Sequence, residues 1–595
     1  MFVEKKRRME EQLWFACRDG KVEEVIKLLQ NSQININFQD SERNYFTPFC
    51  IACAGGHIEI VKLLLNDKRV DITKGNENGN FSPFFIACYK GYIEIVKLLL
   101  NDERVDINKG NENGGETPVL IACSEGQIEV VELLLNDKRI DINKENENGA
   151  TPFSIACDKG HIDIVKLLLN DKRIDINKED KNGWTLFSFF CGNGQTEIVK
   201  LLLLNDARIE VNKANKYGET PFYITCYQNQ IEIVKLLLND ERVELNKTNE
   251  YGATPFYIAC YKGYIEIVKL LLNDDRIEVN KADKYGETPF CISCSKGYIE
   301  IVELLLNDQR IVDVNKVDED GKTPFYAACG YGHIEIVKIL LNDERFDINK
   351  TLSSGETPFY VACQNGRREI VKILLNDERV EINRANQWDQ TPFWIACANG
   401  HIEIVKLLLN DNRIGLNKEN KNTQTPFFIA CENGQIEIVK LLVIDKRIDV
   451  NKGEKIQGFS PLHCICQNNQ FEIVQYLLAM KREINLNVKD NNGKLPIDIS
   501  REREQMEIYG WESEERFQEK RKCTKIVELL ELFERNPIKI RTRLRIQLGF
   551  AGNSFFLKKK KLFNFSKIFI FQDKDSVSIF SIMVLLSDSY LDFKK

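Results

Sequence analysis

The chain has 595 residues, of which 43% are hydrophobic and 29% are charged, and its formal net charge is −7. No apolar stretch of seven or more residues follows the basic residues near the start. The longest apolar run near the end, residues 577–586, has about half the length needed to cross a bilayer. These features argue against a secreted or membrane-spanning chain. We expect an intracellular protein, cytoplasmic rather than nuclear, although Lys5–Arg8 could act as a nuclear-import signal.

The charge is unevenly distributed along the chain. Residues 537–595 hold 12 Lys and Arg against 4 Asp and Glu. The residues before them hold 70 Lys and Arg against 85 Asp and Glu. Such an asymmetry is typical of a tail that behaves differently from the body of the protein.

A Thr-Pro dipeptide, or a close variant of it, recurs at intervals of 34 or 35 residues, and we call the first residue of each dipeptide the anchor of its repeat. At two of these anchors one half of the dipeptide is missing, because Leu186 follows Thr185 and Leu495 replaces the threonine. A fixed period of this length indicates a repeat architecture. The anchors are Thr47, Ser82, Thr117, Thr151, Thr185, Thr220, Thr254, Thr288, Thr323, Thr357, Thr391, Thr425, Ser460 and Leu495.

The unit that starts at Thr254 illustrates the local structure that each repeat should form. Thr254 can cap a helix and Pro255 suits the first helical position, so residues 256–260 are predicted to form a short helix. Residues 265–272 carry apolar side chains at helical spacing and predict a second helix. The polar residues 273–286 end in a turn signal. One such unit cannot bury its own apolar face, so it must stack on the next.

These units resemble the ankyrin repeat, which consists of Thr-Pro, an inner helix, a Gly, an outer helix of the form GHIEIVKLLLND, and a β-turn finger. The resemblance covers roughly residues 11–535 and implies an all-α fold, an α-solenoid of helix-turn-helix repeats with a short basic C-terminal tail. We expect an N-terminal capping repeat at 1–46, thirteen ankyrin repeats at 47–494, a C-terminal capping repeat with a charged insertion at 495–536, and a basic tail at 537–595, which could be partly disordered. In the last repeat, the outer helix is expected at residues 525–533.

The sequence predicts no catalytic site, no metal site and no cofactor. Fourteen of the 18 cysteines occupy one column at the end of the inner helix, where a free thiol behaves as a small buried hydrophobe. Stacked helices lie roughly 8–10 Å apart, too far for disulfides between neighbouring columns. Cys291 and Cys294 could form half of a zinc site, but no matching second pair exists. The chain contains no catalytic motif, and its histidines mostly start outer helices.

Partners of ankyrin proteins usually lie against the fingertips and the exposed side of the inner helices, which together form the concave face. Tyrosine and tryptophan recur in three columns of that face, as protein-binding surfaces favour. The alternative is that these rings pack against the next finger, and the third column is most open to it. The predicted contact residues are Tyr217, Tyr251, Tyr285 and Trp388 at fingertips, Tyr227 and Tyr261 on inner helices, and Tyr223, Tyr257 and Trp394 three residues after the anchor.

The resemblance therefore implies a non-enzymatic protein-binding scaffold or adaptor, which we expect to be a monomer. One alternative is an inhibitory regulator that occludes a specific enzyme or transcription factor. Another is a membrane or nucleic-acid tether that acts through the basic tail. In that tail, residues 538–545 alternate apolar and basic side chains, as a strand or a basic arm would, and residues 558–561 are four lysines.

Overall fold

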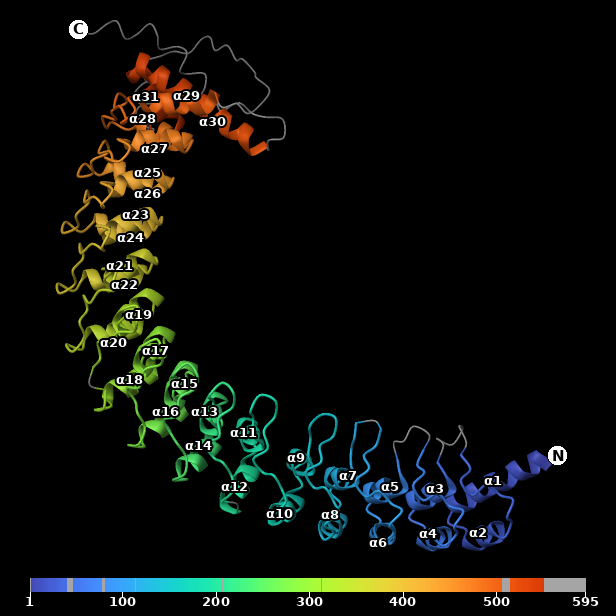
Figure 1. Cartoon of the computed structure of the whole chain (residues 1–595). Helices are drawn as coiled ribbons and strands as arrows, with labels where there is room; N and C mark the ends of the chain where they lie inside the picture. The colour runs from blue at the N-terminus through green and yellow to red at the C-terminus, as the bar shows by residue number, and fades with distance from the viewer. Residues whose placement is uncertain are drawn as a thin grey trace, which may run out of the picture. The chain divides into compact units, whose positions relative to one another are not determined.

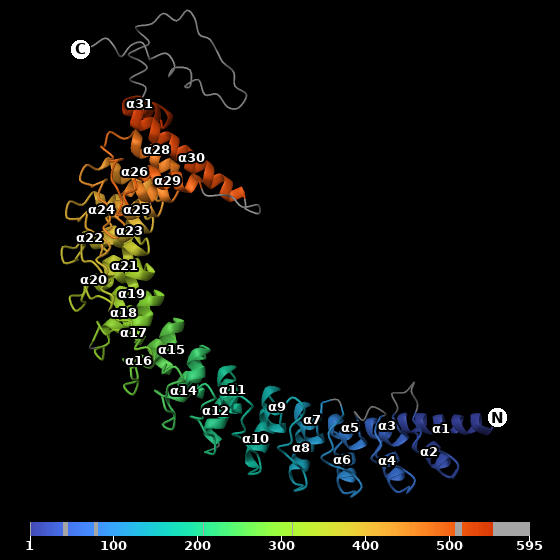
Figure 2. The ribbon, with the colours of Figure 1, turned by 45° about the horizontal axis from the view of Figure 1, so that its top comes forward.

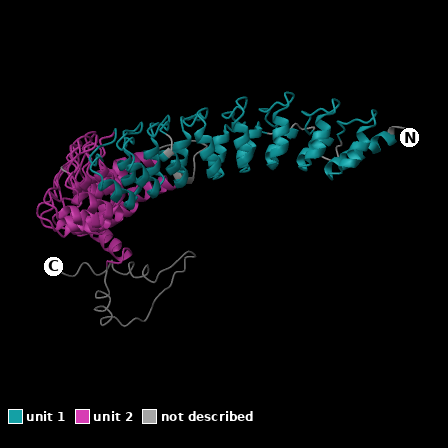
Figure 3. Ribbon diagram, turned by 90° about the horizontal axis from the view of Figure 1, so that it is seen from below, with its two compact units in different colours: residues 1–284 teal, residues 285–595 magenta. Residues whose placement is uncertain are grey.

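The computed structural model describes residues 2–39, 46–76, 81–112, 114–205, 207–311, 313–505 and 514–550. Within these ranges the chain forms 31 helices and no β-strand, which confirms the predicted all-α repeat class. Inner and outer helices alternate along the chain, and in Figures 1 and 2 the odd-numbered and even-numbered helices of the first part form separate rows. The chain divides into two units, residues 1–284 and residues 285–595 (Figure 3).

Unit 1 contains eight pairs of helices, and each inner helix packs on the inner helix of a neighbouring repeat. The inner helices are α1 (Phe2–Arg18), α3 (Pro48–Ala54), α5 (Pro83–Lys90), α7 (Pro118–Ser124), α9 (Pro152–Asp158), α11 (Leu186–Gly192), α13 (Pro221–Tyr227) and α15 (Pro255–Lys262). The outer helices are α2 (Val22–Leu29), α4 (Ile58–Leu65), α6 (Ile93–Leu100), α8 (Ile128–Leu135), α10 (Ile162–Asn170), α12 (Thr196–Asn205), α14 (Ile231–Leu238) and α16 (Ile265–Leu272).

Unit 2 continues the same alternation and ends in one additional helix. Its inner helices are α17 (Pro289–Lys296), α19 (Pro324–Tyr331), α21 (Pro358–Gln364), α23 (Pro392–Ala398), α25 (Pro426–Glu432), α27 (Pro461–Gln467) and α29 (Pro496–Gln505). Its outer helices are α18 (Ile299–Asn307), α20 (Ile334–Leu341), α22 (Arg368–Leu375), α24 (Ile402–Leu409), α26 (Ile436–Ile444), α28 (Phe471–Ala479) and α30 (Glu514–Arg535), which α31 (Pro537–Gln547) follows.

From α3 onward, each inner helix starts directly after an anchor, as predicted. The Thr254 hydroxyl oxygen accepts a hydrogen bond from the Tyr257 amide at 3.0 Å, and Pro255 takes the first helical position, where no backbone donor is needed. Gly263 ends the helix with a φ of 77°, a conformation that glycine adopts without steric cost. The same hydroxyl-to-amide cap occurs at Thr47, Ser82, Thr117, Thr151, Thr185, Thr220, Thr288, Thr323, Thr357, Thr391 and Thr425.

The core is built from columns of identical positions. All 18 cysteines are buried and free, and burial raises the pKa of column thiols such as Cys88, Cys123 and Cys226 above the usual range. Phenylalanine occupies most of the column two residues after the anchor, where it is almost completely buried. These side chains are Phe49, Phe84, Phe153, Phe187, Phe222, Phe256, Phe290, Phe325, Phe359, Phe393 and Phe427.

The C-terminal end differs from the prediction. The last outer helix, α30, is already helical at Glu514, and residues 537–547 form the helix α31 rather than a strand or an extended arm. This helix packs against α28 and α30, with Ile540 and Leu544 buried. The part of the predicted tail that holds lysines 558–561 lies outside the described residues.

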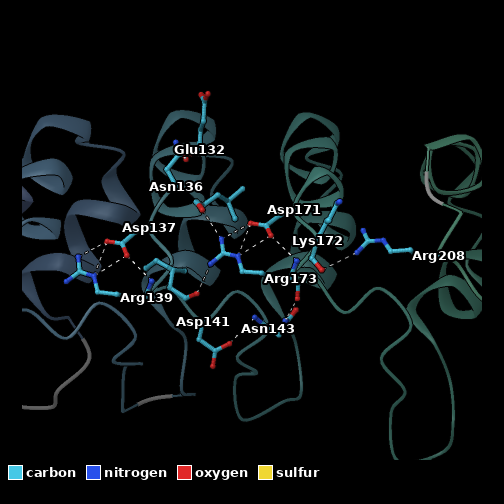
Figure 4. Close-up of polar contacts among 12 residues, drawn as sticks. Glu132, Asn136, Asp137, Arg139, Asp141, Asn143, Asp171, Lys172, Arg173 and Arg208 are labelled. Carbon is cyan, nitrogen blue, oxygen red and sulfur yellow. Dashed lines mark hydrogen bonds and ion pairs between the residues drawn. The ribbon is translucent and has the colours of Figure 1, made fainter.

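An arginine clamp joins neighbouring repeats near the ends of most outer helices (Figure 4). Arg173 Nη2 lies 2.6 Å from Asp171 Oδ2 and donates to the Leu135 carbonyl, at the end of α8 in the preceding repeat, at 2.8 Å. A cation at that place satisfies a helix-end carbonyl and suits the helix dipole. The equivalent contacts join Arg69 to Leu29, Arg104 to Leu65, Arg139 to Leu100, Arg208 to Leu169, Arg242 to Leu203, Arg276 to Leu238, Arg345 to Leu306, Arg379 to Leu341, Arg413 to Leu375 and Arg447 to Leu409.

An asparagine ladder runs beside the clamps. Asn143 Nδ2 donates to the Arg173 carbonyl at 2.6 Å (Figure 4). Asn143 Oδ1 accepts from the Asp175 amide at 3.0 Å. One side chain therefore pairs with both polar groups of the next repeat's backbone. Thr73 is the one residue of this column that is not asparagine, and its hydroxyl donates to Asp71 of its own repeat.

The clamp predicts a specific loss of stability when its forked donor is removed. Arg173→Lys keeps the charge but cannot hold Asp171 and the Leu135 carbonyl together, so we expect the free energy of unfolding to fall by about 1 kcal/mol. The midpoint of urea unfolding, followed by circular dichroism, measures this change. Lys172→Ala, at an exposed neighbouring position, is the matched control and should leave the midpoint unchanged. Equal midpoints for the two variants would rule out a stabilising role for the fork.

Candidate functional site

The finger base and the inner helix share one face of each repeat. The residue directly before the anchor reaches the residue seven places after it in three repeats of unit 2. The hydrogen bonds are Ser295 Oγ to Glu287 at 3.5 Å, Gln424 Nε2 to Glu432 at 3.1 Å, and Lys494 Nζ to Glu502 at 2.7 Å. Because every repeat has the same construction, the fingertip column and this inner-helix column border the same surface.

In unit 1, neighbouring fingertips are tied together through their backbones. The Glu250 amide donates to the Tyr217 carbonyl and the Lys284 amide to the Tyr251 carbonyl, each at 2.9 Å. Gly252, at a φ of 77°, passes so close to the next finger that an added Cβ would lie 2.8 Å from the Lys284 nitrogen. The fingertip tyrosines are thus presented from a fixed backbone.

Six of the nine predicted contact residues are exposed. In unit 1, the exposed fractions are 50% for Tyr217, 54% for Tyr251, 38% for Tyr227 and 37% for Tyr261. In unit 2, Tyr285 and Trp388 are exposed at separate fingertips. The four tyrosines of unit 1 belong to two consecutive repeats, and the structure brings them to one face.

Three of the predicted contact residues, Tyr223, Tyr257 and Trp394, are buried and do not belong to that surface. Their column turns toward the next finger. The Tyr223 hydroxyl accepts from Asn249 Nδ2 at 3.1 Å, and Trp394 Nε1 donates to the Gln424 carbonyl at 3.0 Å. These rings therefore hold one repeat to the next, which is the local packing that the sequence left open as the alternative.

Phe189 is an exposed aromatic residue that the sequence analysis missed. It lies on α11, in a column where Ile224 and Ile258 are buried, yet 44% of its side chain is exposed. No signal in the sequence indicates this exposure, because the equivalent isoleucines of the next two repeats are buried. We name the group of Phe189, Tyr217, Tyr227, Tyr251 and Tyr261 the aromatic patch.

The histidines support the structure and do not form a reactive site. The ring Nε2 of His57, His161, His333 and His401 lies 2.8–3.0 Å from a main-chain carbonyl of the preceding repeat. Burial lowers the pKa of His463, whose ring contacts Ser460 and the Lys494 carbonyl. Among the described residues, no group of three or more His, Cys, Asp or Glu side chains could hold a metal ion.

Within the described ranges, no helix is both long enough and apolar enough to cross a membrane.

Comparison with protein families identifies the class. Models of three consecutive ankyrin repeats match residues 13–111, 103–180, 172–249, 240–318, 309–386 and 378–454, and a single ankyrin repeat matches residues 457–491. The chain therefore belongs to the ankyrin repeat family, whose repeats serve in general as non-enzymatic protein-interaction modules. Comparison with curated proteins gave no match.

The buried thiols predict that the protein loses stability at alkaline pH. In the unfolded chain, cysteines ionise near pH 8.5, whereas burial raises their pKa in the folded chain, for Cys466 to about 12. Unfolding then releases protons, so the free energy of unfolding should fall as the pH rises above about 8.5. Urea midpoints at pH 7, 8, 9 and 10 measure this dependence, and a constant midpoint across that range would contradict it.

Proposed function

We propose that this chain is a non-enzymatic scaffold or adaptor that binds protein partners through the aromatic patch of unit 1. The observation that carries the proposal is the exposure of five aromatic side chains on three consecutive repeats, at fingertips and on inner helices. Large aromatic rings supply much contact area at little cost in side-chain entropy, and they dominate binding energy at protein interfaces.

The same array shows that aromatic residues in these repeats can be buried when they serve packing. Tyr223 and Tyr257 are buried in the very repeats whose Tyr227 and Tyr261 remain exposed. The rings of the patch therefore keep exposed area that a partner can cover. Fingertips fixed by backbone hydrogen bonds also reduce the entropy that a partner must overcome on binding.

The cellular setting that we propose is the cytoplasm, because 18 free, buried thiols suit a reducing compartment. We further propose that the protein acts as a monomer, since each repeat buries its apolar face against neighbours within the chain.

Partner capture from cell lysate tests the proposed surface. A variant with Tyr→Ser at 217, 227, 251 and 261 should lose at least one partner that the wild type retains. Hot-spot aromatics contribute about 2 kcal/mol or more each, so the affinity should fall by more than about a hundredfold. Circular dichroism confirms that the variant is folded.

The control variant carries Ser in place of Tyr285, Tyr331 and Trp388, which are exposed in unit 2. It should capture the same partners as the wild type. Identical partners for the wild type and the unit 1 variant would show that the tyrosines of the patch are not contact residues.

A further inference from the structure

Most lysines on the outer helices pair with a carboxylate three residues earlier. In unit 1, Lys97 Nζ lies 2.7 Å from Glu94, Lys166 lies 3.2 Å from Asp163, and Lys235 lies 2.6 Å from Glu232. Each pair is spaced three residues apart on one helix, so each lysine has its counter-ion within its own repeat. The outer helices therefore present little uncompensated positive charge to a partner.

The lysines beside the aromatic patch have a different environment. Lys216 precedes the fingertip residue Tyr217, and Lys262 follows Tyr261 on α15. Lys284 lies in the finger after that of Tyr251, and its amide donates to the Tyr251 carbonyl. Among the described residues, none of these three ammonium groups has a carboxylate within ion-pair distance. Lys262 Nζ instead lies 4.1 Å from the ring centroid of Tyr227, as a cation–π contact.

Three acidic side chains of unit 1 lie in these fingers, and one of them is Asp283, which is half-buried directly before Lys284. Glu219 accepts a hydrogen bond from Asn215 Nδ2 at 2.8 Å, which engages its carboxylate within its own finger. Lys216, Glu250 and Lys284 occupy the same position in three consecutive fingers, and Glu250, in the middle finger, is exposed. The local balance of exposed charge is therefore positive, on an array whose residues before 537 hold 70 basic against 85 acidic side chains.

A cation that rests on an aromatic ring, without a carboxylate of its own, is prepared to pair with a carboxylate from a partner. Such pairs form at the rim of interfaces and determine which partner is accepted more than how tightly it binds. The apolar area between the charges comes from the rings of the patch. Because the array as a whole is acidic, a long polyanion such as a nucleic acid would be repelled outside this small positive region.

We infer that the aromatic patch recognises a polypeptide segment that combines carboxylates with apolar side chains. Its carboxylates pair with Lys216, Lys262 and Lys284, and its apolar side chains pack among the exposed rings. This inference rests on the proposed function, because it specifies the chemistry of the partner that the patch binds.

Selection from a displayed library of random 16-residue peptides, with the full chain as bait, tests the inference. Selected peptides should be enriched in both Asp or Glu and aromatic or Leu residues relative to the starting library. A synthetic copy of the most enriched peptide should bind the triple variant K216E, K262E and K284E at least tenfold more weakly than the wild type. Binding should also weaken as the NaCl concentration rises from 50 to 500 mM.

The matched control reverses the same number of charges on the outer helices of unit 1, as K97E, K166E and K235E, and should bind the peptide within twofold of the wild type. Selected peptides without acidic enrichment, or equal binding by the K216E, K262E and K284E variant, would overturn the inference. Tighter binding of a twenty-nucleotide oligothymidine than of any selected peptide, lost in that variant, would overturn it as well, in favour of a single-stranded nucleic acid.

The tyrosine variant of the patch separates this inference from the proposed function. If the tyrosine variant loses the peptide and the lysine variant keeps it, the patch is a binding site without the inferred charge preference. If both variants bind as the wild type does, the patch itself is not the site.

Discussion

The structure depends on the way each repeat satisfies the polar groups that its neighbour leaves open. A short helix exposes carbonyls at its C-terminal end, and a stack of short helices would leave many of them without donors. Here the arginine clamps bind the ends of the outer helices, and histidine rings contact carbonyls near the ends of the inner helices. Apolar stacking supplies the core, while these directional contacts set the register of one repeat on the next.

This construction also determines which positions are available for function. Columns that hold the anchor Thr, the core Phe and Cys, and the clamp Arg are committed to the fold. The side chains of the fingertip column and of the exposed inner-helix column differ from repeat to repeat, and several of them remain exposed. The aromatic patch and its lysines lie in these columns or directly beside them, whereas the outer helices repeat the same ion pair almost unchanged.

Much of the fold could be predicted from the sequence because the period is so regular. The Thr254 cap was evident from one unit and recurs at eleven other anchors, and the two helices that follow it recur along the array. The helix α31 was not predictable from local pattern, because alternation of apolar and basic residues is typical of a strand. Tertiary contacts decide the outcome there: Arg541 Nε and Arg545 Nη1 donate to the Leu478 and Ala479 carbonyls, each at 3.3 Å.

The contact surface could be predicted only in part. Fingertip exposure of Tyr217 and Tyr251 followed from position in the repeat. The Tyr223 hydroxyl accepts a hydrogen bond from Asn249 in the following repeat, and Phe189 is exposed in a column whose next two isoleucines are buried. A column-by-column interpretation of the sequence includes neither the contact with the following repeat nor this difference within one column.

Because Thr73 stands where the other repeats have asparagine, the junction between its repeat and the next has fewer hydrogen bonds than its neighbours. Every neighbouring junction of the asparagine ladder is closed by a side chain that holds two backbone groups of the next repeat, but Thr73 turns back to Asp71. At that junction the Arg104 clamp on the Leu65 carbonyl acts without the two hydrogen bonds that an asparagine would add. When the chain is pulled from its two ends, we expect this junction to part before its neighbours, so the first repeats would peel away while the repeats that carry the patch stay folded.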